Sequence, residues 1–122
     1  MKISNDKFKI DDKSILNYYE IKSNKPKLLL LHAQGTNSLS FMSVINKLSK
    51  YFHIYLVDYY GHGKSSFNRE KYNLIDIGND IIKFIEEVIK DNVSVLGHSS
   101  GGLIASYIAS NCELCSGLIL ED

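Results

Sequence analysis

The segment Gly97-His98-Ser99-Ser100-Gly101-Gly102 constrains the fold of this chain more than any other, because of the runs that flank it. The apolar run 93–96 before it is typical of a buried strand, and the run 103–109 after it is typical of a helix. Where a strand turns sharply into a helix the two backbones approach closely, and glycines on either side of the central serine leave room for this approach. The sequence therefore predicts a strand, a tight turn and a helix, with Ser99 at the apex.

A serine at such an apex can act as a nucleophile. Its hydroxyl projects above the edge of the sheet, at the positive end of the following helix dipole. The backbone N–H of Ser100 would then point toward the oxyanion that forms when Ser99 attacks a carbonyl group. The same letters also occur in glycine-rich loops that only join a strand to a helix, or that bind an anion at the helix N-terminus. The flanking strand and helix, together with the additional Gly102, favour the nucleophile.

Two further segments continue the pattern of a buried strand that ends in a turn. They are residues 27–35, KLLLLHAQG, and residues 53–65, HIYLVDYYGHGKS. In order and spacing, these segments and the serine turn resemble the H-G-x-x-G oxyanion turn, the D-x-x-G-H-G-x-S turn and the nucleophile elbow of the α/β-hydrolase fold superfamily. Residues 117–122 are similar to the strand that follows the nucleophile helix in that family, so the resemblance extends from about Ile15 onward.

This resemblance implies an α/β fold with a mostly parallel sheet and helices on both faces. Residues 1–122 are then expected to form the N-terminal part of a single α/β-hydrolase domain, with strands one to six and truncated after the sixth. In the family, the lid, the triad acid and the triad histidine follow this part, so we expect them beyond Asp122.

The resemblance also implies hydrolysis of a carboxylic ester or thioester through a covalent acyl-enzyme on Ser99, with no metal or organic cofactor. By position, the backbone N–H of Gln34 matches the second oxyanion donor, beside that of Ser100. Ala33 stands where the family usually has glycine, which predicts an oxyanion pocket of altered shape. A serine nucleophile argues against the epoxide hydrolases and haloalkane dehalogenases of the superfamily. The residues expected to shape the turns are His32, Gly35, Asp58, Gly61, Gly63, Gly97 and Gly101.

The general base that a nucleophilic serine requires is missing from this chain. In the α/β-hydrolase order the triad acid and histidine both follow the serine, but residues 100–122 contain no histidine. All four histidines lie before Ser99; among them, His53 is expected at the surface and His98 is expected to point away from the serine hydroxyl. Glu121 is a minor candidate for the triad acid. The alternative function is therefore a non-catalytic α/β-hydrolase-like fragment or binding protein, inactive because the histidine is missing.

Composition argues against several other classes of function. Lys plus Arg and Asp plus Glu both number 14, so no net field attracts nucleic acid or an anionic membrane. The longest apolar run, 28–31, is too short to span a bilayer, and the N-terminus lacks the apolar core of a secretion signal, which indicates a cytoplasmic location. Residues 63–65 resemble the end of a phosphate-binding loop, but Asp58 occupies the position at which that motif requires glycine. Cys112 and Cys115 lack a second pair of soft ligands, so we expect free thiols and no metal.

The remaining periodicity predicts strands over 8–10 and 15–21 and helices over 40–50 and 74–90, the charged residues of the last lying on a solvated face. Beyond these elements, the apolar residues 118–120 would form an open edge of the sheet, the kind of edge that pairs with other chains. We therefore expect the isolated chain to self-associate and to have no esterase turnover. The expected partner of the complete domain is a small-molecule ester or thioester.

Overall fold

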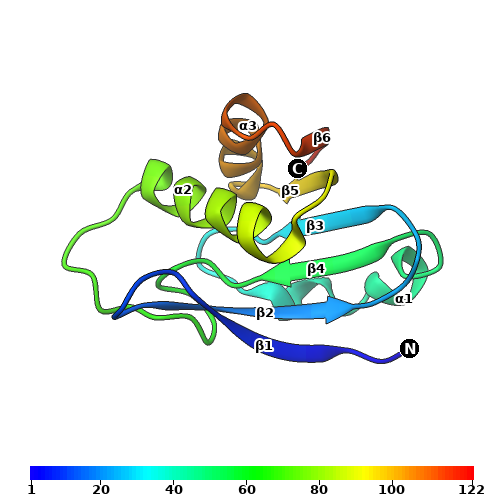
Figure 1. Cartoon of the computed structure of the whole chain (residues 1–122), viewed down its shortest axis with the longest axis horizontal. Helices are drawn as coiled ribbons and strands as arrows, with labels where there is room; N and C mark the ends of the chain where they lie inside the picture. Colours follow the sequence, from blue (N-terminus) through cyan, green and yellow to red (C-terminus); the bar gives the residue numbers. More distant parts are fainter.

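Six strands form one sheet in the order β1-β2-β4-β3-β5-β6, with β1 and β6 at its two edges (Figure 1). This computed structural model describes all of residues 1–122. β2 pairs antiparallel with both β1 and β4, whereas the pairs β3–β4, β3–β5 and β5–β6 are parallel. The predicted mostly parallel α/β sheet is therefore confirmed. The strands are β1 (Ser4–Lys9), β2 (Ile15–Ile21), β3 (Lys27–Leu31), β4 (His53–Val57), β5 (Val93–His98) and β6 (Cys115–Glu121).

Helices cover both faces of this sheet, as predicted (Figure 1). Residues of α2 and α3 pack on one face, and residues of η1 and α1 pack on the other. No helix of the structure has the length and apolar character needed to cross a membrane. The helices are η1 (Ser38–Phe41), α1 (Ile45–Leu48), α2 (Leu74–Phe84), its π-helical continuation η2 (Ile85–Ile89) and α3 (Gly101–Asn111).

The four consecutive leucines of β3 show how the sheet buries both faces. Leu28 and Leu30 belong to the core on the α1 side, whereas Leu29 and Leu31 belong to the larger core on the α2 and α3 side. Successive side chains of a strand point to opposite faces, so an uninterrupted apolar run is typical of a strand that is covered on both sides. β3 therefore lies in the interior of the sheet, between β4 and β5. The turn that follows it begins from a strand buried on both faces.

The structure changes three of the local expectations. The helix expected over 40–50 is instead a 3₁₀ turn followed by the short α1, because serines and β-branched residues weaken helix formation there. The first strand is β1, which begins at Ser4 rather than at Phe8. The helix from Leu74 is confirmed, but one carboxylate on its expected solvated face, Asp80, is buried and accepts two hydrogen bonds from the Arg69 guanidinium.

Candidate active site

Three turns meet at the carboxyl edge of the parallel strands. We name them the oxyanion turn (residues 32–36), which follows β3, the Asp58 turn (residues 58–65), which follows β4, and the elbow (residues 97–102), which joins the end of β5 to the start of α3. The backbone N–H of Gln34 donates to the Ser100 hydroxyl at 2.6 Å, and that of Gly35 donates to the His62 Nε2 at 3.0 Å. Open α/β sheets bind ligands outside the carboxyl ends of their strands, so these turns lie where such a fold places its site.

The elbow holds Ser99 in a strained backbone conformation. Its φ is +54°, in the left-handed region that residues other than glycine rarely adopt. The backbone N–H of Ser99 donates to the carbonyl of Glu121 at 2.6 Å, which ties the apex of the elbow to the end of β6. Strain of this kind persists only where the surrounding structure fixes it, and it is concentrated at functional sites.

Gly97 shows why the elbow cannot carry larger residues. A Cβ at this position would lie 2.4 Å from the carbonyl oxygen of Gly101 and 2.7 Å from the Cα of Gly102, both of which are backbone atoms. The strand that leads into the elbow and the helix that leads out of it are therefore in direct backbone contact. At Gly102 the nearest atom to such a Cβ is the Leu120 Cδ2 at 3.4 Å, an ordinary contact, so only the first of these two positions requires glycine on steric grounds.

The two backbone donors expected to stabilise an oxyanion differ in their present partners. The N–H of Gln34 is engaged by the Ser100 hydroxyl, whereas the backbone N–H of Ser100 itself has no acceptor within the chain. The Ser100 hydroxyl oxygen is therefore the acceptor of the Gln34 N–H in this structure. The sequence did not predict this contact, because it joins residues that lie 66 positions apart.

The Asp58 carboxylate organises the neighbouring turn. It accepts hydrogen bonds from the backbone N–H of Ser38 at 2.9 Å, from the backbone N–H of Lys64 at 3.1 Å and from the Asn17 side chain at 2.9 Å. Burial alone would raise the pKa of Asp58, but these three donors outweigh it and hold the pKa below its ordinary value. Gly63, with φ +52°, leaves room for this carboxylate, since a Cβ there would lie 2.3 Å from the Asp58 Oδ2.

Two of the four histidines serve the turns. His32 is fully buried; its Nδ1 lies 2.8 Å from the Ala33 carbonyl, and its Nε2 accepts a hydrogen bond from the backbone N–H of Tyr59 at 3.2 Å. Burial lowers the pKa of His32 below its ordinary value. His62 contacts the Tyr60 carbonyl through Nδ1, at 3.1 Å, and the Gly35 N–H through Nε2. Both rings therefore use both of their nitrogens within these turns.

The other two histidines are paired with carboxylates. The expectation of a surface His53 is wrong: the side chain is buried, with Nε2 2.6 Å from the Glu20 carboxylate and Nδ1 2.9 Å from the Ser23 carbonyl. Glu20 belongs to β2, the antiparallel neighbour of β4, and a sequence pattern cannot reveal that these two strands pair. His98 contacts the Glu121 carboxylate through Nδ1, because the two residues are register partners on β5 and β6. No imidazole is hydrogen-bonded to the Ser99 hydroxyl in this structure.

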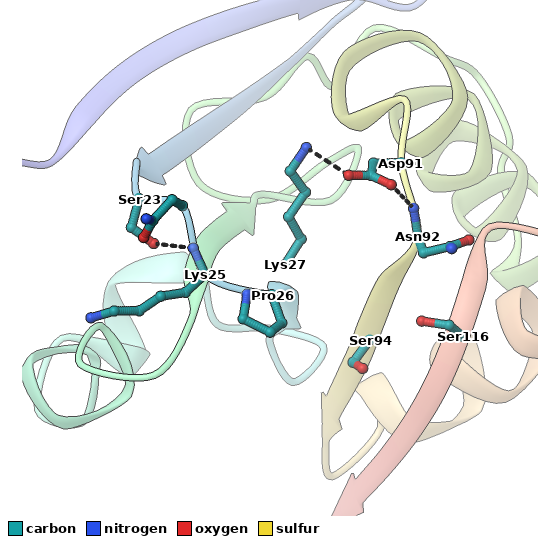
Figure 2. Close-up of a pocket in the computed structure, with 9 residues that line it drawn as sticks. Ser23, Lys25, Pro26, Lys27, Asp91, Asn92, Ser94 and Ser116 are labelled. Atoms are coloured by element: carbon teal, nitrogen blue, oxygen red, sulfur yellow. Dashed lines mark hydrogen bonds and ion pairs between the residues drawn. The ribbon is translucent and has the colours of Figure 1, made fainter.

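A polar hollow of about 360 Å³ lies at the opposite end of the parallel strands (Figure 2). The loop before β3 and the starts of β5 and β6 line it. The Lys27 ammonium lies 3.4 Å from the Asp91 carboxylate, which also accepts a hydrogen bond from the backbone N–H of Asn92 (Figure 2). This hollow is at the amino edge of the sheet, away from the three turns. No group of three or more His, Cys, Asp or Glu side chains in the structure could hold a metal ion, and both cysteines are free thiols.

Comparisons with known proteins agree with the family that the sequences of the three turns resemble. The sequence profile of the alpha/beta hydrolase fold matches residues 26–122. A Haemophilus influenzae protein assigned as an esterase/lipase is 32% identical over 124 residues, which cover 98% of this chain and 43% of that protein. A pimeloyl-[acyl-carrier protein] methyl ester esterase of Yersinia pseudotuberculosis is 36% identical over 93 residues, 75% of this chain and 34% of the esterase.

The fold of a solved structure agrees with these sequence matches. A hydrolase from Pseudomonas aeruginosa matches with a TM-score of 0.88 at 24% sequence identity, over 95% of this chain and 44% of that protein. The chain thus spans less than half the length of each of these relatives. The family profile covers most of the chain, and the sheet order, the elbow and the neighbouring turns agree with it. The chain belongs to the α/β-hydrolase fold family.

Proposed function

We propose that this chain provides the nucleophile and the oxyanion donors of a serine hydrolase that acts on a carboxylic ester or thioester. The observation that carries the proposal is the strained Ser99 at the elbow, beside a backbone N–H of Ser100 that has no acceptor. A nucleophile must stand clear of the sheet edge, and a preorganised N–H gives more to a transition state than a donor that must first reorient. The methyl ester esterase of Yersinia supports this substrate class.

In the proposed reaction the Ser99 hydroxyl oxygen attacks the carbonyl carbon of the substrate, and the carbonyl oxygen becomes an oxyanion. The N–H groups of Gln34 and Ser100 donate to that oxyanion, so the Ser100 hydroxyl must first release the Gln34 N–H. Collapse of the tetrahedral intermediate expels the alcohol or thiol and leaves an acyl group on Ser99. Water then attacks this ester, and the acid product leaves.

The proton of Ser99 needs a base, and the engagement of the imidazoles argues against finding it within residues 1–122. Three of the rings use both nitrogens in other contacts, and His98 is held by Glu121 through Nδ1. We infer that a histidine outside this segment supplies the base. The carboxylate of Glu121 has His98 as its partner, which weakens its candidacy as the triad acid.

The absence of an imidazole hydrogen-bonded to the Ser99 hydroxyl also favours a second candidate function. If no histidine is supplied from elsewhere, the chain is a non-catalytic α/β-hydrolase-like protein. The elbow would then be a structural turn that binds a carbonyl or an anion at the start of α3, without forming a covalent bond.

Fusion of this chain to the part of the Haemophilus relative that lies beyond the matched region separates the two functions. We expect p-nitrophenyl ester hydrolysis by the fusion, covalent labelling of Ser99 by a fluorophosphonate, and neither with the 122-residue chain alone. Ser99→Ala should lower kcat of the fusion by several orders of magnitude, on the order of 10⁶. Ser106→Ala removes a hydroxyl that bonds only within α3, so it is the matched control and should retain activity. A folded fusion without labelling at Ser99 would favour the non-catalytic function.

A further inference from the structure

Two neighbouring backbone N–H groups of the oxyanion turn donate to side chains of the other two turns. The N–H of Gln34 donates to the Ser100 hydroxyl of the elbow at 2.6 Å. The N–H of Gly35 donates to the Nε2 of His62, in the Asp58 turn, at 3.0 Å. The Gly35 N–H has no other acceptor in the structure. His62 is therefore the one hydrogen-bonding partner that orients this N–H.

The contact at Gly35 also bears on Gln34, because their N–H groups belong to adjacent peptide planes. The plane that contains the Gly35 N–H also contains the Gln34 carbonyl, and a planar peptide cannot turn one without the other. Gly35 itself adds little stiffness, since its φ is +85° and a Cβ there would meet no atom within 4 Å. The hydrogen bond to His62 therefore fixes ψ of Gln34, the residue whose N–H we propose as an oxyanion donor.

The two partners of His62 are compatible with one protonation state of its ring. The Tyr60 carbonyl can only accept, so the Nδ1 that lies 3.1 Å from it carries the hydrogen. The Gly35 N–H can only donate, so Nε2 must present its lone pair. A second proton would bind at Nε2, and two donors would then face each other. The neutral imidazole thus holds the Gly35 N–H, and the imidazolium releases it.

We propose that His62 is a positioning residue of the oxyanion turn, and that it holds Gln34 in place only while its imidazole is neutral. When a proton from water adds to Nε2, the hydrogen bond from Gly35 breaks and the one to the Tyr60 carbonyl remains. No covalent bond of the chain changes, so loss of the proton restores the contact. The effect on an oxyanion rests on the proposed function, whereas the release of Gly35 does not depend on it.

The surroundings of His62 make it the ring through which a proton acts on this turn. The ring of His32 lies 5.3 Å away between centroids and is fully buried, whereas His62 is partly exposed. Burial lowers the pKa of His32, and a positive charge on His62 would lower it further. The other titratable neighbours are Tyr59, whose ring lies 5.7 Å away and whose pKa is raised by burial, and Asp58 and Lys64 of the same turn. Water therefore reaches the ring that contacts Gly35 and not the buried one beside it.

NMR can observe the Gly35 amide alone, because Gln34 is the only glutamine of the chain. A sample with carbonyl-¹³C glutamine and ¹⁵N glycine gives one signal in a spectrum that selects ¹³C–¹⁵N peptide bonds. We expect this signal to shift with pH at the midpoint of the His62 ring nitrogens, measured on the same chain with ¹⁵N histidine. Protection of the Gly35 amide from hydrogen exchange, relative to an unstructured peptide, should fall roughly tenfold across that midpoint.

Two variants of His62 separate its role as an acceptor from its role in packing. His62→Phe keeps an aromatic ring without an acceptor, so the protection of Gly35 should be lost at every pH. His62→Gln supplies an amide oxygen that does not titrate, so Gly35 should keep its protection and lose its transition. His98→Gln is the control, since that imidazole contacts Glu121, and it should leave the Gly35 transition unchanged. A wild-type Gly35 signal that does not move, or that follows the midpoint of His32, would overturn the proposal, as would an unchanged transition in His62→Gln.

The fusion with the Haemophilus segment adds a kinetic measurement. Because a displaced oxyanion donor stabilises the transition state less, His62→Phe should lower kcat roughly tenfold with KM nearly unchanged. His62→Gln should recover most of this loss. An active fusion whose kcat is the same in His62→Phe as in the wild type would overturn the positioning role. A fusion without esterase activity would count against the proposed function alone, since the titration of Gly35 still decides whether His62 holds the turn.

Discussion

The Asp58 turn and the elbow lie at the same carboxyl edge of the sheet, with β3 and the oxyanion turn between them, but different interactions hold them in place. In the first, one buried carboxylate accepts hydrogen bonds from three donors, so the turn gains stability from its polar contacts. In the second, the chain is fixed by close backbone contact at Gly97 and holds Ser99 in a left-handed conformation. The Asp58 turn stabilises the fold, whereas the elbow costs free energy.

This difference teaches where the rigidity of the proposed site comes from. The Ser38 N–H that donates to the Asp58 carboxylate belongs to η1, which begins shortly after the oxyanion turn. His32 in turn accepts from the N–H of Tyr59. The stable turn is thereby coupled to the segment that carries Gln34, while the strained elbow is held by β5, α3 and the carbonyl of Glu121. A strained Ser99 beside a rigid polar frame is consistent with the preorganised site that we propose.

The largest expected effect follows from removing the carboxylate of the stable turn. Asp58→Ala leaves the buried donors of Ser38 and Asn17 and the part-buried N–H of Lys64 without an acceptor, and we expect a loss of about 4 kcal/mol in the free energy of unfolding. Urea unfolding at low protein concentration measures this loss. Asp58→Asn keeps the shape and one acceptor oxygen, so it should lose less. If both variants unfold at the urea midpoint of the wild type, the Asp58 turn is not what stabilises this edge.

Acid should weaken the same turn without any substitution. The folded pKa of Asp58 lies below its ordinary value, so the ionised carboxylate contributes stability above the unfolded pKa of about 3.9. That contribution is lost as the pH falls through the lower, folded pKa. Unfolding free energies measured from pH 6 to pH 2 should therefore decline below about pH 4. The decline should be shallower in Asp58→Asn, and equal slopes in the two proteins would contradict this assignment.

The elbow is tested by adding a methyl group to it. Gly97→Ala places a Cβ against backbone atoms of Gly101 and Gly102, which cannot move without displacing α3, and we expect a loss of about 3 kcal/mol. Gly102→Ala is the matched control, since its Cβ would make an ordinary contact and alanine favours a helix. It should change the free energy of unfolding by less than about 0.5 kcal/mol. Equal losses in both variants would show that the close approach at Gly97 is not limiting.

The sequence predicted those parts of the molecule that depend on local pattern. The leucine run of β3, the strand–turn–helix unit around Ser99 and the helix from Leu74 were all readable, because burial periodicity and glycine position act over a few residues. The helix expected over 40–50 failed because a 3₁₀ turn followed by a short helix gives nearly the same apolar spacing. Element boundaries of this kind depend on packing rather than on pattern.

The polar contacts of the site could not be predicted in the same way. Gln34 meets Ser100, Asp58 meets Asn17 and His53 meets Glu20 across 66, 41 and 33 positions of the chain. Each pair is determined by the order and register of strands in the finished sheet. The pair of His98 and Glu121 is an example, since the parallel register of β5 and β6 makes the two residues neighbours. A sequence identifies which residues can do chemistry, and the topology decides which of them meet.

The smallest effect, and the only one of opposite sign, is expected at the apex of the elbow. Ser99→Gly removes the side chain that disfavours φ +54°, so we expect a gain of about 1 kcal/mol in the free energy of unfolding, together with loss of the proposed nucleophile. Ser99→Ala also removes the hydroxyl but keeps a Cβ, so it should give no gain. Lys90, with φ +56° at the end of η2, provides a second control. Lys90→Gly should give a similar gain with no effect on the elbow. If Ser99→Gly destabilises the chain while Lys90→Gly stabilises it, contacts of the Ser99 side chain outweigh its strain, and the elbow is not held at a cost.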